Sequence, residues 1–152
     1  MDQSTALSPH AMLASVGSVE CSAVSEARIR VVCADDHPSV RENLRYLINA
    51  EPDLECVAVG RDGVEAVRAC EEQLPDVLVV DEDMPRGTGL DVIQWLSAEM
   101  PDLPIILYTL NSEACGKAQA LGAAGCIIKD SPYETLLRAI REAGSRRSVA
   151  TT

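Results

Sequence analysis

Residues 76–90 read DVLVVDEDMPRGTGL, an apolar run that ends in three closely spaced carboxylates and continues into a Met-Pro step and two glycines. The apolar run is typical of a strand that is buried on both faces, as in a parallel sheet covered by helices on both sides. Asp81, Glu82 and Asp83 follow at the carboxyl end of this strand. Because clustered carboxylates repel one another, the stretch predicts that a positive group lies beside Asp81.

Four further apolar runs flank this strand, and stretches with helical periodicity separate all five. This alternation predicts repeated βα units that build a parallel sheet. The expected strands cover residues 28–34, 54–59, 76–81, 104–109 and 125–129. The expected helices cover residues 38–50, 62–73, 89–99, 112–121 and 132–143. In the last helix, Ser131 is expected to cap the backbone, Pro132 to take the first position and Glu134 to complete a capping box.

The predicted fold is an α/β, flavodoxin-like doubly wound sandwich with a five-stranded parallel sheet of order 2-1-3-4-5 and five helices. The length suits one domain, which we place at residues 28–145. Residues 1–27 are rich in Ser and Ala and are expected to form a disordered tail. Residues 146–152 are expected to form a short C-terminal tail.

The composition excludes several classes of partner. The chain carries a formal net charge of -11, whereas nucleic acids and anionic membrane surfaces are bound by clustered Lys and Arg. Direct binding of nucleic acid is therefore not expected. No stretch is typical of a signal peptide or a membrane span, so we expect no membrane insertion and a cytoplasmic protein.

Six cysteines are scattered singly, without a CxxC pair or a histidine spacing that would indicate zinc. Most lie in apolar segments, which favours free buried thiols over a disulfide framework. Cys126, beside two isoleucines, is expected to be an inert interior thiol rather than a redox sensor. The six are Cys21, Cys33, Cys56, Cys70, Cys115 and Cys126.

Polar side chains follow four of the five expected strands. In the predicted strand order these four ends are neighbours, so we expect their side chains to converge on one shallow pocket. Taken singly, each has an ordinary role, such as a helix cap for an Asp or a solvated strand end for a Lys. Together they favour a functional site. The residues are Asp35, Asp36, Asp81, Asp83, Thr109 and Lys129.

The chemistry of these residue types points to phosphoryl transfer assisted by a metal ion. Oxygen ligands with open water positions suit Mg²⁺. An Asp carboxylate can form an acyl phosphate, and Asp81 is the best candidate because it directly follows the central apolar run. Lys129 and the Thr109 hydroxyl would supply charge and hydrogen bonds to the phosphoryl oxygens. Glu82 is expected to point into solvent.

Four stretches, in this order, resemble the response-regulator receiver domains of two-component signalling: ADDHPSVRENL, PDVLVVDEDMPRGTGL, PIILYT and GAAGCIIKDSPYETLLRAI. The resemblance covers roughly residues 28–144. The DDHP and KDSP variants are most similar to receivers of LuxR-type transcription regulators. No helix-turn-helix follows in the sequence, so we expect a single-domain regulator without a DNA-binding output domain.

The resemblance implies that a sensor histidine kinase or a phosphotransfer protein phosphorylates Asp81 in the presence of Mg²⁺. It implies further that Thr109 and Lys129 contact the phosphoryl group. The implied metal site comprises the side chains of Asp35, Asp36 and Asp81 and the backbone carbonyl of Asp83.

Three positions depart from the usual receiver pattern and bear on its switch. Leu110 follows Thr109 where receivers generally have a small residue, and its bulk is expected to affect access to the pocket or the movement of Thr109. Cys126 stands where receivers usually carry a Tyr or Phe that rotates on activation. Asp130 replaces the proline that commonly follows the lysine. The resemblance therefore does not decide whether the peptide bond before residue 130 is cis.

The leading hypothesis is a response regulator, not an enzyme, that signals through protein contacts of the helices near 112–121 and 132–143 or drains phosphate as a sink. The alternative is a receiver-like interaction module that works without phosphorylation. A phosphohydrolase of the haloacid dehalogenase type is disfavoured because its motif order is reversed here. His10 and His37 are not expected to be phosphorelay histidines, and Trp95 and Tyr46 are expected in the core or an interface.

Overall fold

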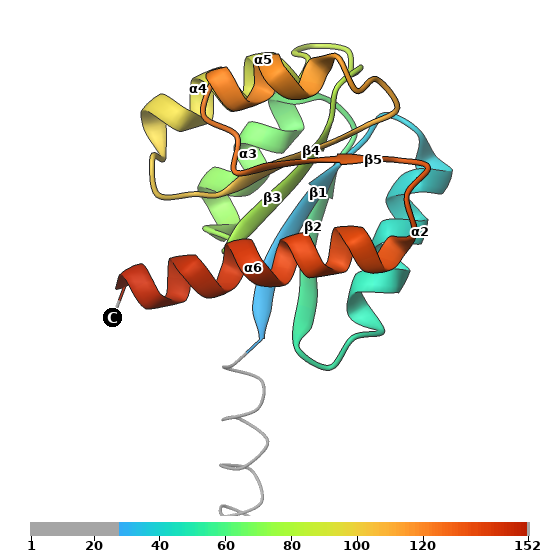
Figure 1. Ribbon diagram of the computed structural model, residues 1–152, viewed down its shortest axis with the longest axis vertical. Coiled ribbons are helices and arrows are strands. Elements are labelled where there is room, and N and C mark those ends of the chain that lie inside the picture. Colours follow the sequence, from blue (N-terminus) through green and yellow to red (C-terminus); the bar gives the residue numbers. More distant parts are fainter. Residues whose placement is uncertain (1–27, 152) are drawn as a thin grey trace, which may run out of the picture.

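The computed structural model describes residues 28–151, with side chains up to residue 146. One parallel five-stranded sheet, of order β2-β1-β3-β4-β5, lies at its centre (Figure 1). This order confirms the predicted doubly wound α/β fold. The strands are β1 (Ile29–Ala34), β2 (Leu54–Gly60), β3 (Val77–Asp81), β4 (Ile105–Thr109) and β5 (Gly125–Ile128).

Five helices cover the two faces of the sheet. Figure 1 shows α2 and α6 on one face and α3, α4 and α5 on the other. Such alternation arises when right-handed crossovers connect parallel strands on either side of the first strand. The helices are α2 (Pro38–Asn49), α3 (Gly63–Gln73), α4 (Gly89–Glu99), α5 (Ala114–Ala120) and α6 (Tyr133–Thr151). No helix in the described range is long and apolar enough to cross a lipid bilayer.

Each face of the sheet has its own hydrophobic core. On one side, Leu44 and Ile48 of α2 and Ile140 of α6 are fully or almost fully buried against the sheet. On the other side, Ile93 and Leu96 of α4 are fully buried. Every residue of β3 and β4 is buried, which explains why these two strands read as continuous apolar runs in the sequence.

The last helix differs from its predicted bounds at both ends. α6 begins at Tyr133, one residue later than expected, and the backbone N–H of Thr135 donates to the carbonyl of Pro132. The helix continues to Thr151, so residues 146–151, expected as a tail, extend it. Gly144 lies inside the helix, where α6 passes β1 so closely that a Cβ would overlap the side chain of Ile29. The predicted tail at residues 1–27 lies outside the described residues.

The cysteines correct the expectation of free thiols in part. Cys115 in α5 and Cys126 in β5 form a disulfide, with their Cα atoms 5.5 Å apart. Their separation of eleven residues resembles no cysteine motif, and only the return of the chain through β5 beside the start of α5 brings them together. Cys33, Cys56 and Cys70 are free thiols, as expected, and Cys21 lies outside the described residues.

Candidate functional site

The carboxyl ends of the central strands bring the predicted charged residues together. Asp35 directly follows β1, Asp81 is the last residue of β3, and Lys129 directly follows β5. Asp35 and Asp81 are both buried, at 1% and 6% exposure. The convergence follows from the strand order, because β1 and β3 are hydrogen-bonded neighbours and parallel strands end at the same edge.

Lys129 bridges the two buried carboxylates. Its Nζ donates hydrogen bonds to Asp35 Oδ2 at 2.7 Å and to Asp81 Oδ1 at 2.9 Å. Burial alone would lower the pKa of Lys129, but the hydrogen bonds to the two carboxylates outweigh it and the pKa is raised. The ammonium therefore stays charged, and it supplies the positive group that the sequence predicted beside Asp81.

Asp81 experiences opposing influences on its acidity. Burial raises the pKa of its carboxyl group, the negative charge of Asp35 adds to this effect, and the hydrogen bond from Lys129 opposes it. The net result is a pKa above the ordinary value of an aspartate. A further cation in the pocket would favour the ionised carboxylate, which is the form that can attack an electrophile.

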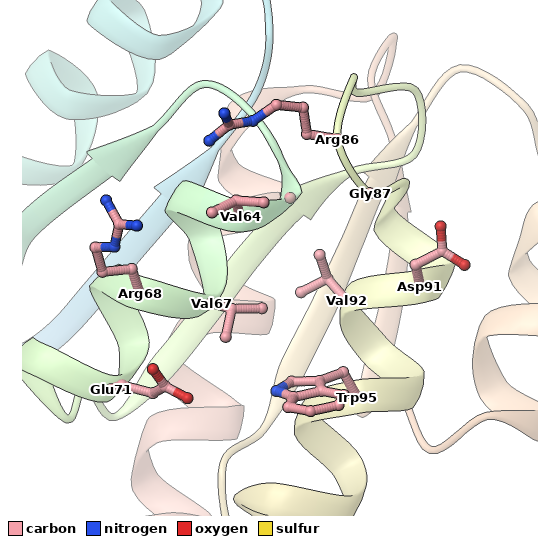
Figure 2. Close-up of a pocket in the computed structure, with 10 residues that line it drawn as sticks. Val64, Val67, Arg68, Glu71, Arg86, Gly87, Asp91, Val92 and Trp95 are labelled. Carbon is pink, nitrogen blue, oxygen red and sulfur yellow. The ribbon is translucent and has the colours of Figure 1, made fainter.

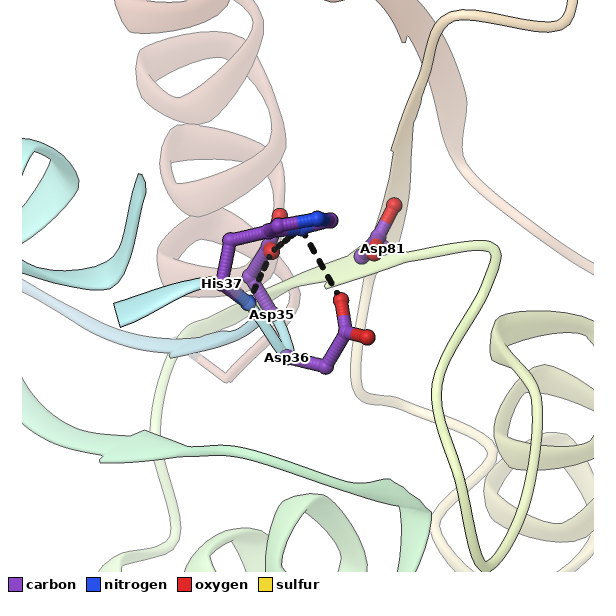
Figure 3. Close-up of side chains that lie close together, drawn as sticks. All are labelled: Asp35, Asp36, His37 and Asp81. Carbon is purple, nitrogen blue, oxygen red and sulfur yellow. Dashed lines mark hydrogen bonds and ion pairs between the residues drawn. The ribbon is translucent and has the colours of Figure 1, made fainter. Parts of the chain in front are cut away.

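A cluster of possible metal ligands surrounds Asp81. One ligand atom from each of Asp35, Asp36, His37 and Asp81 lies within 4.8 Å of the others (Figure 3). Oδ1 of Asp36 is buried and accepts no hydrogen bond from the described residues, and its contact with His37 Nδ1 at 3.0 Å is an ion pair only when the imidazole is protonated. A buried carboxylate oxygen without a hydrogen-bond donor is costly, and a bound cation would satisfy it. The carboxylate oxygens of this cluster could therefore hold a hard divalent ion.

His37 is the member of this cluster that the sequence argument missed. It occupies the N-cap position of α2 without a side-chain capping hydrogen bond, and its imidazole Nδ1 lies 3.2 Å from Asp35 Oδ1 and 3.0 Å from Asp36 Oδ1. The side chain is 66% exposed, and imidazole is not a preferred ligand of Mg²⁺. The sequence feature that could have indicated its place in the cluster is that His37 directly follows the Asp35–Asp36 pair. The short connection is visible in the structure, where the backbone N–H of His37 also donates to Asp35 Oδ1 at 2.9 Å.

Thr109 is at the predicted place, but its hydroxyl is bonded to a residue that was expected to face solvent. Thr109 Oγ1 donates to Glu82 Oε1 at 2.9 Å and accepts the backbone N–H of Asn111 at 3.0 Å. The expectation for Glu82 was therefore wrong. Its side chain folds back because it leaves β3 beside the end of β4, where the buried Thr109 offers a hydroxyl donor.

The pocket above these residues has a volume of about 360 Å³. Leu110 lines it but is 72% exposed, so its bulk lies mostly in solvent rather than inside the pocket. Asp83 also lines the pocket with an exposed side chain, and the metal-binding role of its carbonyl stays a prediction. The lining residues are His37, Asp81, Glu82, Asp83, Thr109, Leu110, Asn111 and Lys129.

The loop after Asp81 is held close to the strand end by Gly89. The backbone N–H of Gly89 donates to the carbonyl of Glu82 at 2.8 Å. A Cβ at Gly89 would overlap the carbonyl oxygen of Asp81, so only glycine permits this approach. The glycine therefore keeps the loop 82–88 compact beside the carboxylate cluster.

Besides Leu110, two positions depart from the receiver pattern, and the structure describes both. Cys126 is neither aromatic nor a free thiol, because it is bonded to Cys115. An aromatic ring does lie near the site, since the buried Tyr108 of β4 has its ring centroid 5.7 Å from Lys129 Nζ. The peptide bond before Asp130 is not cis, as holds for every peptide bond in the described part of the chain.

A second hollow, of about 500 Å³, lies between α3 and α4, and its lining includes Val67, Val92 and Trp95 (Figure 2). None of the carboxylates around Asp81 lines it. The indole of Trp95 is 55% exposed and the ring of Tyr46 is 75% exposed, which excludes the core position considered for both.

Comparisons with known proteins agree with this arrangement. A family described as the response regulator receiver domain matches residues 31–141. The oxygen regulatory protein NreC of Staphylococcus epidermidis is 39% identical over 116 residues, which cover 74% of this chain and 53% of the relative. The chain thus spans about half the length of the curated relatives it matches.

Two solved structures illustrate the same similarity. The receiver domain of the putative response regulator NarL from Mycobacterium tuberculosis has a TM-score of 0.72 and 29% identity, and the match covers 78% of this chain and 97% of that one. A two-component response regulator of the LuxR family from Aurantimonas has a TM-score of 0.74 and 32% identity, with 79% and 87% covered.

Proposed function

The chain belongs to the response regulator receiver domain family, and from this premise we propose that it accepts a phosphoryl group on Asp81 in a two-component phosphorelay. The donor would be a sensor histidine kinase or a phosphotransfer protein. The observation that carries the proposal is the bridge of Lys129 between Asp35 and Asp81, beside a buried Asp36 oxygen whose neighbour His37 makes no hydrogen bond to it and to which no other described residue donates one. This arrangement suits a site that gathers further negative charge together with a cation.

In the proposed reaction an oxygen of the Asp81 carboxylate attacks the phosphorus of the donor. A new O–P bond forms, and the bond from phosphorus to the donor breaks with its electron pair leaving on the donor. Asp81 is suited to this attack because it ends β3 at the floor of the pocket. Lys129, which already donates to Asp81, would compensate the charge of the acyl phosphate.

Asp35, Asp36 and Asp81 would hold Mg²⁺, together with the backbone carbonyl of Asp83. When bound, the ion supplies positive charge to the phosphoryl oxygens. Thr109 would donate its hydroxyl to the phosphoryl group, for which its hydrogen bond to Glu82 has to break.

We place the protein in the cytoplasm, where it would pass the signal on by protein contacts of α5, β5 and α6 or act as a phosphate sink. It would accept a phosphoryl group without turning over a substrate as an enzyme. NreC is named as a regulatory protein, and we propose that this protein acts without binding nucleic acid directly. The net charge of -11 favours protein contacts.

A second candidate function is an interaction module that works without phosphorylation. Two observations favour it: the Thr109 hydroxyl already donates to Glu82, and Cys126, which stands where receivers usually carry an aromatic switch residue, is held in a disulfide. Both bear on how the signal is transmitted, whereas the carboxylates and Lys129 are all in place for accepting phosphate.

Intact-mass measurement after incubation with a small acyl phosphate, with and without Mg²⁺, separates the two candidates. We expect the wild type to gain one phosphoryl group only with Mg²⁺, and Asp81→Asn to gain none. Asp102→Asn is the matched control, since it neutralises an exposed carboxylate that does not line the pocket and should label like the wild type.

Two outcomes of this experiment would contradict the proposal. If the wild type gains no phosphoryl group under any condition, the interaction module becomes the better explanation. If Asp81→Asn labels as well as the wild type, the acceptor has been assigned to the wrong residue.

A further inference from the structure

We propose that Cys115 and Cys126 form a reversible thiol–disulfide site that controls the local opening of α5. The disulfide joins the first turn of α5 to the middle of β5, and both residues are half-buried rather than enclosed. Part of each residue is therefore in contact with solvent, and we expect reductants and oxidants to approach the disulfide from this side. Disulfides that occur in a reducing cytoplasm are usually transient and redox-sensing, which favours a switch over a permanent brace.

The noncovalent attachment of α5 to the sheet is weak. The helix has only seven residues, and its N-cap Glu113 makes no side-chain capping hydrogen bond. Its buried side chains are Ala114 and Ala118, which remove little apolar area from water. Gly116 lies inside the helix and faces open space, so it lowers helix stability without serving a close contact. The disulfide is therefore the strongest tie that α5 has to β5.

The disulfide also lies close to the phosphoacceptor pocket along the chain. Thr109 and Cys115 are separated only by the loop 110–113 and Ala114. On the other side, Cys126 pairs with Leu107 in the sheet, and Lys129 follows three residues later. The backbone N–H of Lys129 donates to the carbonyl of Thr109 at 2.8 Å. The two chain segments that lead from the disulfide, residues 109–115 and 126–129, are therefore joined again at the pocket. Because the disulfide links these two segments, it restricts how far the loop 110–113 can move.

The exchange reaction is balanced with a low-molecular-weight disulfide, RSSR, as oxidant. The thiolate of one cysteine attacks a sulfur of RSSR, and one RS⁻ leaves. The thiolate of the other cysteine attacks the protein-bound sulfur of this mixed disulfide and releases the second RS⁻. The two protons lost by the cysteines end on two molecules of RSH. A dithiol reverses the reaction and is itself oxidised to a cyclic disulfide.

Hydrogen–deuterium exchange of the full-length protein, in oxidised and reduced form, tests the proposal. Peptide mapping establishes the redox state by detecting the linked Cys115–Cys126 peptide. On reduction we expect exchange of the Ala114–Ala120 amides to rise by about tenfold or more, while that of α4 stays unchanged. Equal exchange of α5 in both forms, or failure to form the linked peptide with RSSR, would overturn the proposal.

Substitutions separate this effect from general oxidation damage. Cys126→Ser should show the fast exchange of α5 in both conditions, whereas Cys56→Ser, which removes a half-buried free thiol, should keep the full redox response. Adding Gly116→Ala to Cys126→Ser should restore part of the protection, because the alanine meets no atom and favours the helix. No restoration would mean that the disulfide does not act by holding α5.

The consequence for signalling rests on the proposed function and has a separate readout. If reduction frees α5, phosphorylation with a small acyl phosphate should change exchange in α5 at least about threefold more in the reduced than in the oxidised protein. If phosphorylation changes exchange in α5 equally in the oxidised and reduced forms, the disulfide does not control how α5 responds to phosphorylation. Absence of phosphoryl uptake in both forms overturns the proposed function alone, because the redox effect on α5 is measured without phosphate.

Discussion

α4 and α5 lie side by side on the same face of the sheet, yet different forces hold them. α4 has eleven residues, and a capping box between Thr88 and Asp91 satisfies its first turn. Val92, Ile93 and Leu96 anchor it in the core. α5 has seven residues, its N-cap Glu113 makes no side-chain capping hydrogen bond, its buried residues are two alanines, and a disulfide ties it to β5.

This difference separates a supporting element from one that is suited to move. α4 begins at Gly89, which packs against the carbonyl of Asp81, so its position determines the position of the carboxylate. α5 follows Thr109 through the loop 110–113 and contributes no residue to the carboxylate cluster. A receiver needs a rigid acceptor site and a responsive face, and neighbouring helices of unequal anchorage provide both.

The largest expected effect tests the anchorage of α4. Leu96→Ala should lower the free energy of unfolding by about 2–5 kcal/mol, because it leaves a cavity at a fully buried position. Ala118→Gly, the corresponding change in α5, should cost only about 1 kcal/mol. Equilibrium denaturation in urea measures both. Equal losses would mean that the two helices do not differ in the way described.

Removal of the α4 cap should have a smaller effect. Thr88→Ala abolishes the bond in which Thr88 Oγ1 accepts the N–H of Asp91 at 3.2 Å, and we expect a loss of about 1 kcal/mol. Thr88→Ser keeps the oxygen and serves as the control. Urea denaturation of the three proteins under the same conditions gives the comparison, and a neutral Thr88→Ala would show that the cap contributes nothing.

A stabilising change should make α5 more like α4. Gly116→Ala adds a methyl group where no atom of the described residues lies within 4 Å, so the gain in helix propensity should appear as about 0.5–1 kcal/mol of stability. The gain should be visible in thermal unfolding of the reduced protein. Destabilisation by this substitution would indicate that α5 does not tolerate the added group and that its glycine has a packing role.

The smallest expected effect concerns the opposite face, where α6 is tied to the α2–β2 loop. Arg141 donates two hydrogen bonds to Asp53, and this lowers the pKa of the Asp53 carboxyl group. Because the pair is partly exposed, Arg141→Gln should cost no more than about 0.5–1 kcal/mol at neutral pH.

The pH dependence of this loss checks its origin. A lowered pKa in the folded protein stabilises it above the unfolded value of about 3.9, and the stabilisation disappears as the pH falls through the folded value. The difference between wild type and Arg141→Gln should therefore be full at pH 7 and shrink below about pH 4. A difference that stays constant down to pH 3 would contradict an origin in Asp53.

Much of the fold and the pocket could be predicted because the relevant signals are local. The buried strands β3 and β4 are continuous apolar runs, and Asp35, Asp81 and Lys129 each stand at the end of such a run. The strand order then places them together without further information. The bridge made by Lys129 is the physical result of that order.

The contacts that were missed join residues whose proximity no local pattern encodes. Glu82 and Thr109 are 27 residues apart and meet across two strand ends. Gly144 has the appearance of a helix end, but its neighbour in space is Ile29, at the start of β1. In each case the two residues come together only when the sheet has formed and the helices have packed against it.

The sequence by itself determined the alternation of strands and helices, the strand order and the acidic edge around Asp81, because hydrophobic periodicity and the ends of apolar runs are written along the chain. Only the tertiary structure decided that His37 joins the carboxylates, that Glu82 holds Thr109, and that Cys115 and Cys126 form a bond. The physical reason is that hydrogen bonds and disulfides depend on distances of a few ångströms, and packing of the complete sheet and its helices sets those distances.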